Sequence, residues 1–444
     1  MLIIPLGNTT AKITSQHDLF YDYLIQTFGT DFAKNYLDAN EKAIRNIKEI
    51  IDAEKIDCDF EWQDSFVYTD SEDEVIKIKN EVTSVNSLGF PAEFVTTSSL
   101  PFSILAGIKF PNQAQFHPLK YCKGLSDCVV QNGGQIYEDT KVYDVDKKDT
   151  YYEVQTNEHT VHAKYVVLAC HYPIINAPGF YFLKMYQETS YLIGFTTNSP
   201  LFSGMYINTK SPICSLRTVP YNGNRLVLMG GSEHKTGSKE DLSDCYRNLE
   251  NHAKELYPDA NILYHWNTED CISLDKVPYI GEFSELMPHM YVATGFKKWG
   301  MTTSNVAANI ITDMIMEKEN PYATTFKSTR FHPLKNGTEF VNMLKQTTDS
   351  LILDKFKIPN DTLNSIDKDE AKIVSVENTK LGIYRDKEGK YYALKPVCSH
   401  LGCELSWNNL DKTWDCPCHG SRFSYTGKSL YDPSVKDIKL IDLD

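Results

Sequence analysis

The sequence predicts an α/β domain over residues 1–325, a linker over 326–350 and a small all-β domain over 351–444. Its 444 residues exceed the roughly 250–300 that one hydrophobic core usually supports. Helical periodicity alternates with strand-like runs in the first part, and short strands separated by turns fill the last part. A polar, weakly patterned stretch lies between the two parts, as is typical of a connector. We therefore expect two domains of different fold class.

Six stretches of the first part have apolar residues at the spacing of an amphipathic helix. The expected helices cover residues 17–29, 31–53, 73–86, 118–131, 239–256 and 301–317. Strands are expected at 60–68, 104–116, 165–169 and 290–294, and within a strand-rich stretch from 188 to 230. The run 165–169 is apolar throughout, which is typical of a parallel strand buried on both faces. In the last part, residues 380–385 and 391–395 flank an Asp-Lys-Glu-Gly turn and predict a hairpin.

The composition excludes some classes of function. The net charge is −14 and no block of Lys and Arg stands out, so a nucleic-acid partner is not expected. No apolar run reaches the roughly 18–20 residues that a transmembrane helix needs. The opening residues also lack the pattern of a secretory signal peptide, and we expect a cytoplasmic protein.

A cluster of Cys and His residues near the C-terminus predicts an iron–sulfur site. Cys398 and His400 form one short pattern, C-x-H, and Cys416 and His419 form a second, C-x-x-H. Two loops that each offer one thiolate and one imidazole fit a [2Fe–2S] cluster in which two His replace two Cys at one iron. Because imidazole is a neutral ligand, such clusters have reduction potentials of roughly −150 to +300 mV, against about −400 mV for all-Cys ferredoxins.

Zinc is the alternative metal, since Cys and His at short spacing also bind zinc. Zinc ribbons usually pair two similar half-sites, whereas the two half-sites here differ, and two further cysteines, Cys403 and Cys418, lie beside them. This pattern favours the iron–sulfur cluster. Gly402 and Gly420 would let the two loops turn tightly and expose backbone N–H groups to the cluster sulfides.

The last ninety or so residues resemble the Rieske ferredoxin domain of the cytochrome bc1 and b6f type, on the two half-sites given above. The resemblance implies that Cys398, His400, Cys416 and His419 are the ligands and that Cys403 and Cys418 form a disulfide. Quinol-oxidising members have a Ser and a Tyr after the second half-site, each donating a hydroxyl hydrogen bond to sulfur. Ser421 retains the first donor, while Phe423 stands in place of the Tyr. Losing a donor destabilises the reduced cluster, so a potential below that of the quinol-oxidising type is expected.

Ring-hydroxylating oxygenases also contain Rieske clusters, but they generally lack the extra cysteine pair. They also need a mononuclear iron site of two His and a carboxylate. Outside the cluster region, the closest His pair is His159 and His162, which flanks an expected hairpin. We therefore interpret that pair as part of the surface and do not favour an oxygenase.

The first domain resembles the FAD-dependent amine and amino-acid oxidases of the glycine oxidase and D-amino-acid oxidase kind. The segments that resemble them are GNTTAKITSQH from Gly7, QAQFHP from Gln113, YVVLA from Tyr165, PYIG from Pro278 and ATGFKKWGMTT from Ala293. In the last segment a strand leads through glycines into a helix, whose N-terminus can stabilise negative charge on a reduced flavin. The resemblance implies FAD contacts from Thr9, Thr10, Lys12, Gly295, Trp299, Gly300 and Met301.

The dinucleotide-binding motif of that family is missing from the sequence. A βαβ unit with G-x-G-x-x-G should precede the matching segments, and only six residues precede Gly7. We therefore expect an FAD-binding fold that lacks its first βαβ unit, with an α+β substrate domain. Either the sequence begins at an internal Met, which we favour, or the FAD site has been lost. In both cases this chain is expected to bind FAD weakly.

Together these patterns predict a flavin- and Rieske-containing oxidoreductase. An amine or another small donor would be oxidised by FAD, and electrons would leave singly through the cluster to a redox partner protein or another acceptor. The alternative is an electron carrier whose first domain is a docking scaffold without FAD. Arg217 could bind a substrate carboxylate, although a surface position is favoured, and Tyr186 and Tyr191 could line a pocket or lie in a core.

Overall fold

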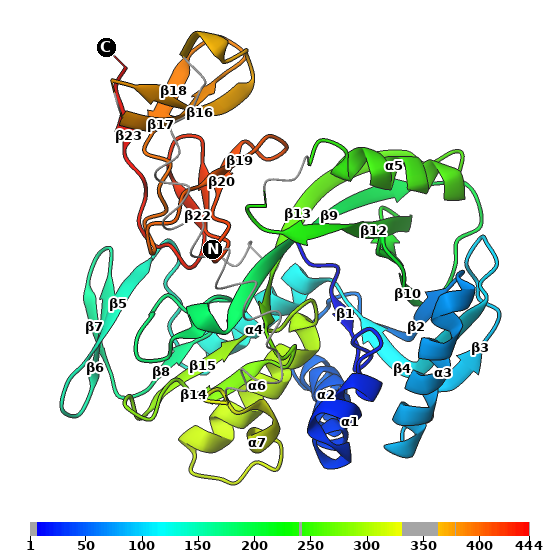
Figure 1. Ribbon diagram of the computed structural model, residues 1–444. Coiled ribbons are helices and arrows are strands. Elements are labelled where there is room, and N and C mark those ends of the chain that lie inside the picture. Colours follow the sequence, from blue (N-terminus) through cyan, green and yellow to red (C-terminus); the bar gives the residue numbers. More distant parts are fainter. Residues whose placement is uncertain (1–6, 239–241, 331–362, 378, 444) are drawn as a thin grey trace.

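The computed structural model describes residues 7–238, 242–330, 363–377 and 379–443. The predicted fold class is confirmed, because a mixed α/β body is followed by a small domain of β-sheets (Figure 1). Most of the expected linker, and the start of the expected C-terminal domain at residue 351, lie outside the described residues. The domain boundaries therefore stay a prediction. No helix of the described ranges is long and apolar enough to cross a membrane.

The helices of the body follow the predicted periodicity closely. They are α1 (Tyr21–Phe28), α2 (Thr30–Ala53), α3 (Glu72–Ser87), α4 (Pro118–Gln131), α5 (Cys245–Leu256), α6 (Gly300–Ile315) and the short α7 (Ala323–Phe326). The longest, α2, buries one face along its whole length, from Ala33 to Ile51. Gly29 separates α1 from α2 at φ 95°, a conformation that side chains with a Cβ rarely adopt.

A nine-stranded sheet forms the larger part of the body. Its strands are β1 (Lys12–Ile13), β2 (Glu61–Thr69), β3 (Glu93–Val95), β4 (Ala106–Gln115), β9 (Met185–Thr196), β10 (Met205–Asn208), β11 (Cys214–Tyr221), β12 (Asn224–Lys235) and β13 (Asn261–Ser273). The order is β1-β4-β2-β10-β11-β12-β9-β13, with β3 paired to β4. The long antiparallel strands β9, β12 and β13 pack against α5 around buried residues such as Tyr191 and Phe195.

A three-stranded sheet carries the segment that leads into α6. It consists of β14 (Tyr279–Glu282), β15 (Met290–Thr294) and β8 (Val166–Leu168), with β8 parallel to β15. The expectation that residues 165–169 are buried on both faces is wrong, because the side chain of Val167 is 43% exposed. In the described residues β8 pairs on one side only, at the edge of its sheet. A separate antiparallel sheet comprises β5 (Val142–Lys147), β6 (Tyr152–Thr156) and β7 (Thr160–Ala163).

In its described residues, the C-terminal domain contains two four-stranded sheets. One contains β16 (Glu370–Val376), β17 (Thr379–Arg385), β18 (Tyr391–Leu394) and β23 (Leu440–Ile441), and the predicted hairpin is its β17–β18 pair. The other contains β19 (Ser406–Asn408), β20 (Thr413–Asp415), β21 (Arg422–Ser424) and β22 (Ser429–Tyr431), and it lies nearer the body (Figure 1). Trp414 is fully buried between the sheets, where Gly382 leaves room for its ring.

Candidate cluster site and cofactor cavity

Two loops of the C-terminal domain hold the predicted cluster residues. Each loop is closed by a pair of backbone hydrogen bonds: Cys398 N–H donates to Cys403 O (2.8 Å) and Gly402 N–H to Cys398 O (2.9 Å). In the second loop, Cys416 N–H donates to Ser421 O at 2.8 Å, and Gly420 N–H donates to Cys416 O at 2.9 Å. Both glycines have φ near +80°, so a side chain at either position would strain the turn.

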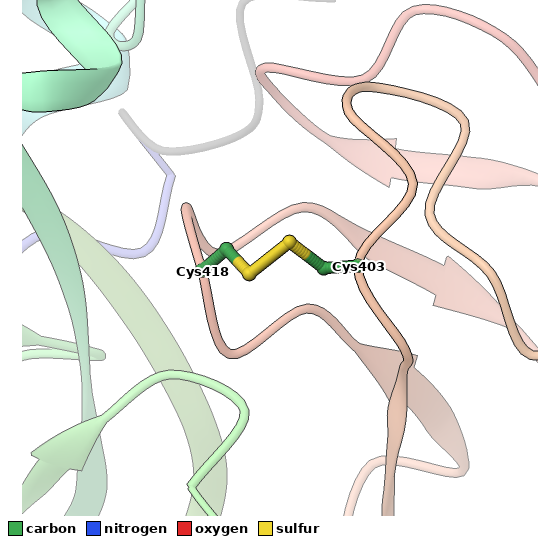
Figure 2. The surroundings of a disulfide bond; sticks show 2 residues. All are labelled: Cys403 and Cys418. Atoms are coloured by element: carbon green, nitrogen blue, oxygen red, sulfur yellow. A yellow bond between two sulfur atoms is a disulfide. The ribbon is translucent and has the colours of Figure 1, made fainter. Parts of the chain in front are cut away.

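A disulfide joins the two loops. It links Cys403 in the first loop to Cys418 in the second, 15 residues later in the chain (Figure 2). Cys403, Cys416 and Cys418 have their sulfur atoms close enough together to suggest a metal site. However, two of these three sulfurs are bonded to each other and are not thiolates, so these three cysteines alone cannot form one. The free cysteines that remain in the loops are Cys398 and Cys416.

The four expected ligands lie together; Cys398, Cys416 and His419 are buried and His400 is partly buried. The ring centroids of His400 and His419 are 5.1 Å apart, and Cys398 and Cys416 are adjacent free cysteines. A hydrogen bond from the Cys416 thiol lowers the pKa of Cys398. Burial lowers the pKa of His400 to about 4 and that of His419 to about 3, so both imidazoles are neutral at pH 7. Neutral imidazole is the form that binds a metal.

Unpartnered nitrogen atoms support the fit to a cluster. Nδ1 of His400 and both ring nitrogens of His419 are buried without a hydrogen-bond partner among the described residues. Buried polar atoms are rarely left without a partner, and metal ligation would satisfy these atoms. Ser421 is fully buried, and a hydrogen bond from its side chain contributes to the lowered pKa of Cys398. The residues present therefore fit the predicted [2Fe–2S] cluster.

A cavity of about 1960 Å³ lies between the body and the C-terminal domain. Six of the seven residues predicted to contact FAD line it: Thr9, Thr10, Lys12, Trp299, Gly300 and Met301. The seventh, Gly295, is not among the lining residues and packs instead beside Met185 and Ser273. The C-terminal domain supplies part of the wall through residues 428–432 and 435–437.

The expected strand–glycine–helix turn is present, since β15 leads through Gly295 to α6, which begins at Gly300. Trp299, at the start of this helix, stacks on His17 with their ring centroids 4.8 Å apart. Its indole Nε1 is buried and has no partner among the described residues, so a bound group could accept its hydrogen bond. The cavity and this unused donor fit a flavin at the N-terminus of α6.

Lys12 is the charged residue among the predicted FAD contacts that line the cavity. Its ammonium donates hydrogen bonds to Tyr206 O at 3.2 Å and to Ser215 Oγ at 2.7 Å. Burial, and secondarily the charge of Arg217, lower the pKa of Lys12 to about 7. Its charge is therefore sensitive to small changes in pH and in the charge of a bound ligand.

Two other expectations about the pocket are corrected by the structure. Arg217 is not on the surface: it is 2% exposed and donates a hydrogen bond to Gln115 Oε1 at 3.0 Å. It does not line the cavity either, so it is not placed to bind a substrate there. Tyr186 lines the cavity, whereas Tyr191 lies in the core beneath the large sheet. His159 and His162 lie on the exposed β6–β7 hairpin, as expected.

Sequence reasoning missed the residues through which the body contacts the cluster domain. Asn176, Glu269 and His171 belong to this group: Asn176 contacts His400, Glu269 pairs with Arg422, and His171 lines the shared cavity. They lie in segments without a metal-binding or catalytic motif. Their roles depend on how the two domains dock, for which local periodicity gives no signal.

Comparison with known proteins agrees with both halves of the structure. A family described as FAD dependent oxidoreductase matches residues 7–314, and a Rieske [2Fe-2S] domain matches residues 358–442. YhfW of Bacillus subtilis (strain 168), whose name describes a Rieske 2Fe-2S iron-sulfur protein, is 38% identical over 438 residues. This match covers 99% of the present chain and 86% of YhfW. A cytochrome b6-f complex iron-sulfur subunit of Nostoc is 43% identical over 49 residues, covering 11% of this chain and 27% of that subunit.

Solved structures show the same fold in the body. Glycine oxidase from Geobacillus kaustophilus has a TM-score of 0.62 at 20% identity, over 73% of this chain and 88% of that one. L-proline dehydrogenase from P. horikoshii has a TM-score of 0.60 at 16% identity, over 73% and 87%. These comparisons do not support the expectation that a first βαβ unit is missing. With its body matching over residues 7–314, the chain belongs to the FAD dependent oxidoreductase family, and it carries a C-terminal Rieske [2Fe-2S] domain.

Proposed function

We propose that this oxidoreductase removes two electrons from an amine-like or other small donor in the cavity and delivers them singly, through the Rieske site, to an external one-electron acceptor. The observation that carries the proposal is the shared cavity. One wall holds the residues that resemble the flavin contacts of amine oxidases, and another belongs to the C-terminal domain. FAD accepts two electrons and can release them one at a time, which suits a partner cluster that carries one.

The chain's own residues would hold the two cofactors. We infer that Cys398, His400, Cys416 and His419 are the cluster ligands and that the hydroxyl of Ser421 donates to sulfur. On the other side of the interface, Thr9, Thr10, Lys12, Gly300 and Met301 would contact FAD beside Trp299. Gly295 would act only by allowing the turn before α6, since it lies away from the cavity wall.

Neighbouring residues connect the wall of the cavity to the candidate cluster site. His171 lines the cavity, and the next residue, Tyr172, contacts the imidazole of His419 with ring centroids 6.4 Å apart. Asp432, in the C-terminal domain, also lines the cavity, and its carbonyl accepts a hydrogen bond from Gln187 at 3.1 Å. An electron leaving the cavity therefore needs to pass few residues to reach a cluster ligand.

Anaerobic reduction tests the proposal. Purified protein containing both cofactors is mixed with a panel of primary and secondary amines and amino acids, and flavin absorbance and the EPR signal of the reduced cluster are followed together. The proposal predicts that an active donor bleaches the flavin and then produces the cluster signal. In Cys416→Ser, which removes one cluster ligand, the same donor should still bleach the flavin without that signal.

The alternative, an electron carrier with no substrate chemistry of its own, predicts a different result. Cluster bands would appear without flavin bands, the cluster would accept electrons from a chemical reductant, and no donor of the panel would reduce it. That outcome would contradict the proposed oxidation of a donor while leaving the cluster assignment intact.

A further inference from the structure

One segment of the body covers the histidine side of the candidate cluster site. Between β8 and β9, Tyr172 and Phe182 place their rings against His419, with centroids 6.4 and 5.8 Å from it. Between them in the chain, Asn176 reaches His400. Both predicted imidazole ligands are thus contacted by a domain other than the one that carries them.

The contact between Asn176 and His400 fixes the roles of both ring nitrogens. His400 Nε2 lies 2.6 Å from Asn176 Oδ1, and an amide oxygen can only accept a hydrogen bond. Nε2 therefore carries the proton of the neutral imidazole. Nδ1, which is buried and has no partner among the described residues, keeps its lone pair for a metal.

We propose that Asn176 is a positioning residue of the Rieske site, which orients His400 and lowers the reduction potential of the cluster. A hydrogen bond accepted from the outer N–H of a metal-bound imidazole fixes the ring and makes it a stronger electron donor. A stronger donor stabilises the oxidised iron more than the reduced iron. This inference rests on the proposed ligation of the cluster by His400.

Asn176 is itself held in place by the body. Its carbonyl accepts a hydrogen bond from Phe180 N–H at 2.8 Å, which closes a turn. The next residue, Tyr181, is 1% exposed, and its hydroxyl donates to Phe283 O at 3.0 Å. The segment is therefore anchored to the body, so its amide can orient a ring of the other domain without adjusting to it.

The docked arrangement is closely packed around this contact. A Cβ atom added to Gly420 would lie 2.6 Å from Gln187 Cβ, and one added to Gly237 would lie 2.5 Å from the backbone nitrogen of Pro417. Glycine is required at both positions because the second cluster loop approaches the body so closely. This packing keeps Asn176 within reach of His400 while the two domains are docked.

The body contacts the two histidines differently. His400 makes a hydrogen bond from its outer nitrogen to a side chain of the body, Asn176, whereas His419 meets the backbone of Phe182. Asn176 is therefore the place at which a single side-chain change should alter the electronic environment of one ligand only. Asp and Leu are close in size to Asn, so each changes the chemistry with little change in volume.

EPR-monitored redox titration of the full chain, with its cluster, tests the proposal. Asn176→Leu removes the hydrogen-bond acceptor and should shift the midpoint potential upward. We expect the equilibrium constant for reduction to rise by up to about tenfold, which corresponds to about 59 mV for one electron. Asn176→Asp supplies a stronger, charged acceptor and should shift it downward. Asn157→Leu, in the exposed loop after β6, is the matched control and should leave the midpoint unchanged.

Iron and acid-labile sulfide are measured on every sample. These measurements distinguish a failure of the positioning role of Asn176 from a failure of the ligand assignment. Unchanged midpoints in both Asn176 variants with intact clusters, or shifts of both in the same direction, would overturn the positioning role alone. Wild-type protein without iron and sulfide would overturn the ligand assignment and this inference with it. If Asn176→Leu does not retain its cluster, the downward shift in Asn176→Asp still decides the question.

Discussion

Lys12 is the residue at which burial has the most direct chemical consequence. Its ammonium lies at the cavity with a pKa lowered to about 7, first by burial and then by Arg217. Lys12 is therefore protonated below about pH 7 and neutral above it. Because FAD carries a negatively charged pyrophosphate, a protonated lysine beside it strengthens binding.

We therefore predict that the affinity for FAD falls, by roughly tenfold, as the pH rises from 6 to 8. Fluorescence titration of the flavin-free protein at several pH values measures this. Lys12→Met should bind FAD weakly at pH 6 and show little change between pH 6 and 8. An equal pH dependence in wild type and Lys12→Met would assign the titration to another group.

Phe423 provides a second prediction at this scale. It is fully buried on β21 and packs in the cluster-domain core with Cys398 and Cys416, without a hydroxyl to donate to sulfur. We expect a midpoint potential below the upper end of the Rieske range, about +300 mV. Phe423→Tyr should raise it by adding a donor that stabilises the reduced cluster. A wild-type midpoint already at the upper end, measured by redox titration, would contradict this explanation.

Among the helices, α1 depends on a side chain from another helix. Glu81 on α3 is 1% exposed and accepts hydrogen bonds from Phe20 N–H, Tyr21 N–H and Asp22 N–H, at 2.7, 2.8 and 2.9 Å. These are N–H groups at the start of α1, which have no partner within their own helix. The carboxylate replaces the capping side chain that α1 lacks.

Glu81→Leu should therefore destabilise the body by about 3 kcal/mol, since it leaves buried N–H groups without acceptors. Urea unfolding followed by tryptophan fluorescence measures the loss. Glu74→Leu on the same helix is the control, because Glu74 forms an ion pair with the exposed Lys77, and its loss should cost less than about 1 kcal/mol. Similar losses in the two variants would show that the cap contributes little.

The sequence predicted elements well where the signal was local. Local patterns predicted the periodicity of α2, the strand β15 and the glycines that lead from β15 into α6. They did not predict the burial of Arg217 or the exposure of Val167, because each depends on partners far away in the chain. At the candidate cluster site, the spacing of Cys and His predicted two loops that the structure brings together. The contact from Asn176 could not be predicted, since it forms only when the domains dock.

At the scale of the whole molecule, a buried ionic network joins the two domains. Arg422 of the cluster domain is 2% exposed and donates to Asp415 Oδ1 at 3.0 Å, to Asp411 Oδ2 at 2.6 Å and to Asn267 Oδ1 of the body at 2.9 Å. Its Nε also lies 3.1 Å from Glu269 Oε1 on β13. The network surrounds one guanidinium with groups from both domains, so removing Arg422 leaves buried carboxyl groups unpaired.

We predict that Arg422→Met weakens docking and costs about 3–5 kcal/mol of stability. Small-angle X-ray scattering should show a larger radius of gyration, and cluster reduction by a donor should slow. Lys412→Met is the control: Lys412 forms a partly exposed ion pair with Asp369 inside the cluster domain, and its loss should change neither quantity. A compact Arg422→Met protein with unchanged reduction kinetics would show that other contacts hold the domains together.

The central claim is that a mixed thiolate–imidazole [2Fe–2S] cluster lies between these two loops and makes this flavin-family oxidoreductase a one-electron donor. Metal and acid-labile sulfide analysis of the purified chain tests it most directly. We predict iron and sulfide in equal amounts, two of each per chain, with both lost in His400→Ala. Zinc in place of iron, with no acid-labile sulfide, would contradict the account.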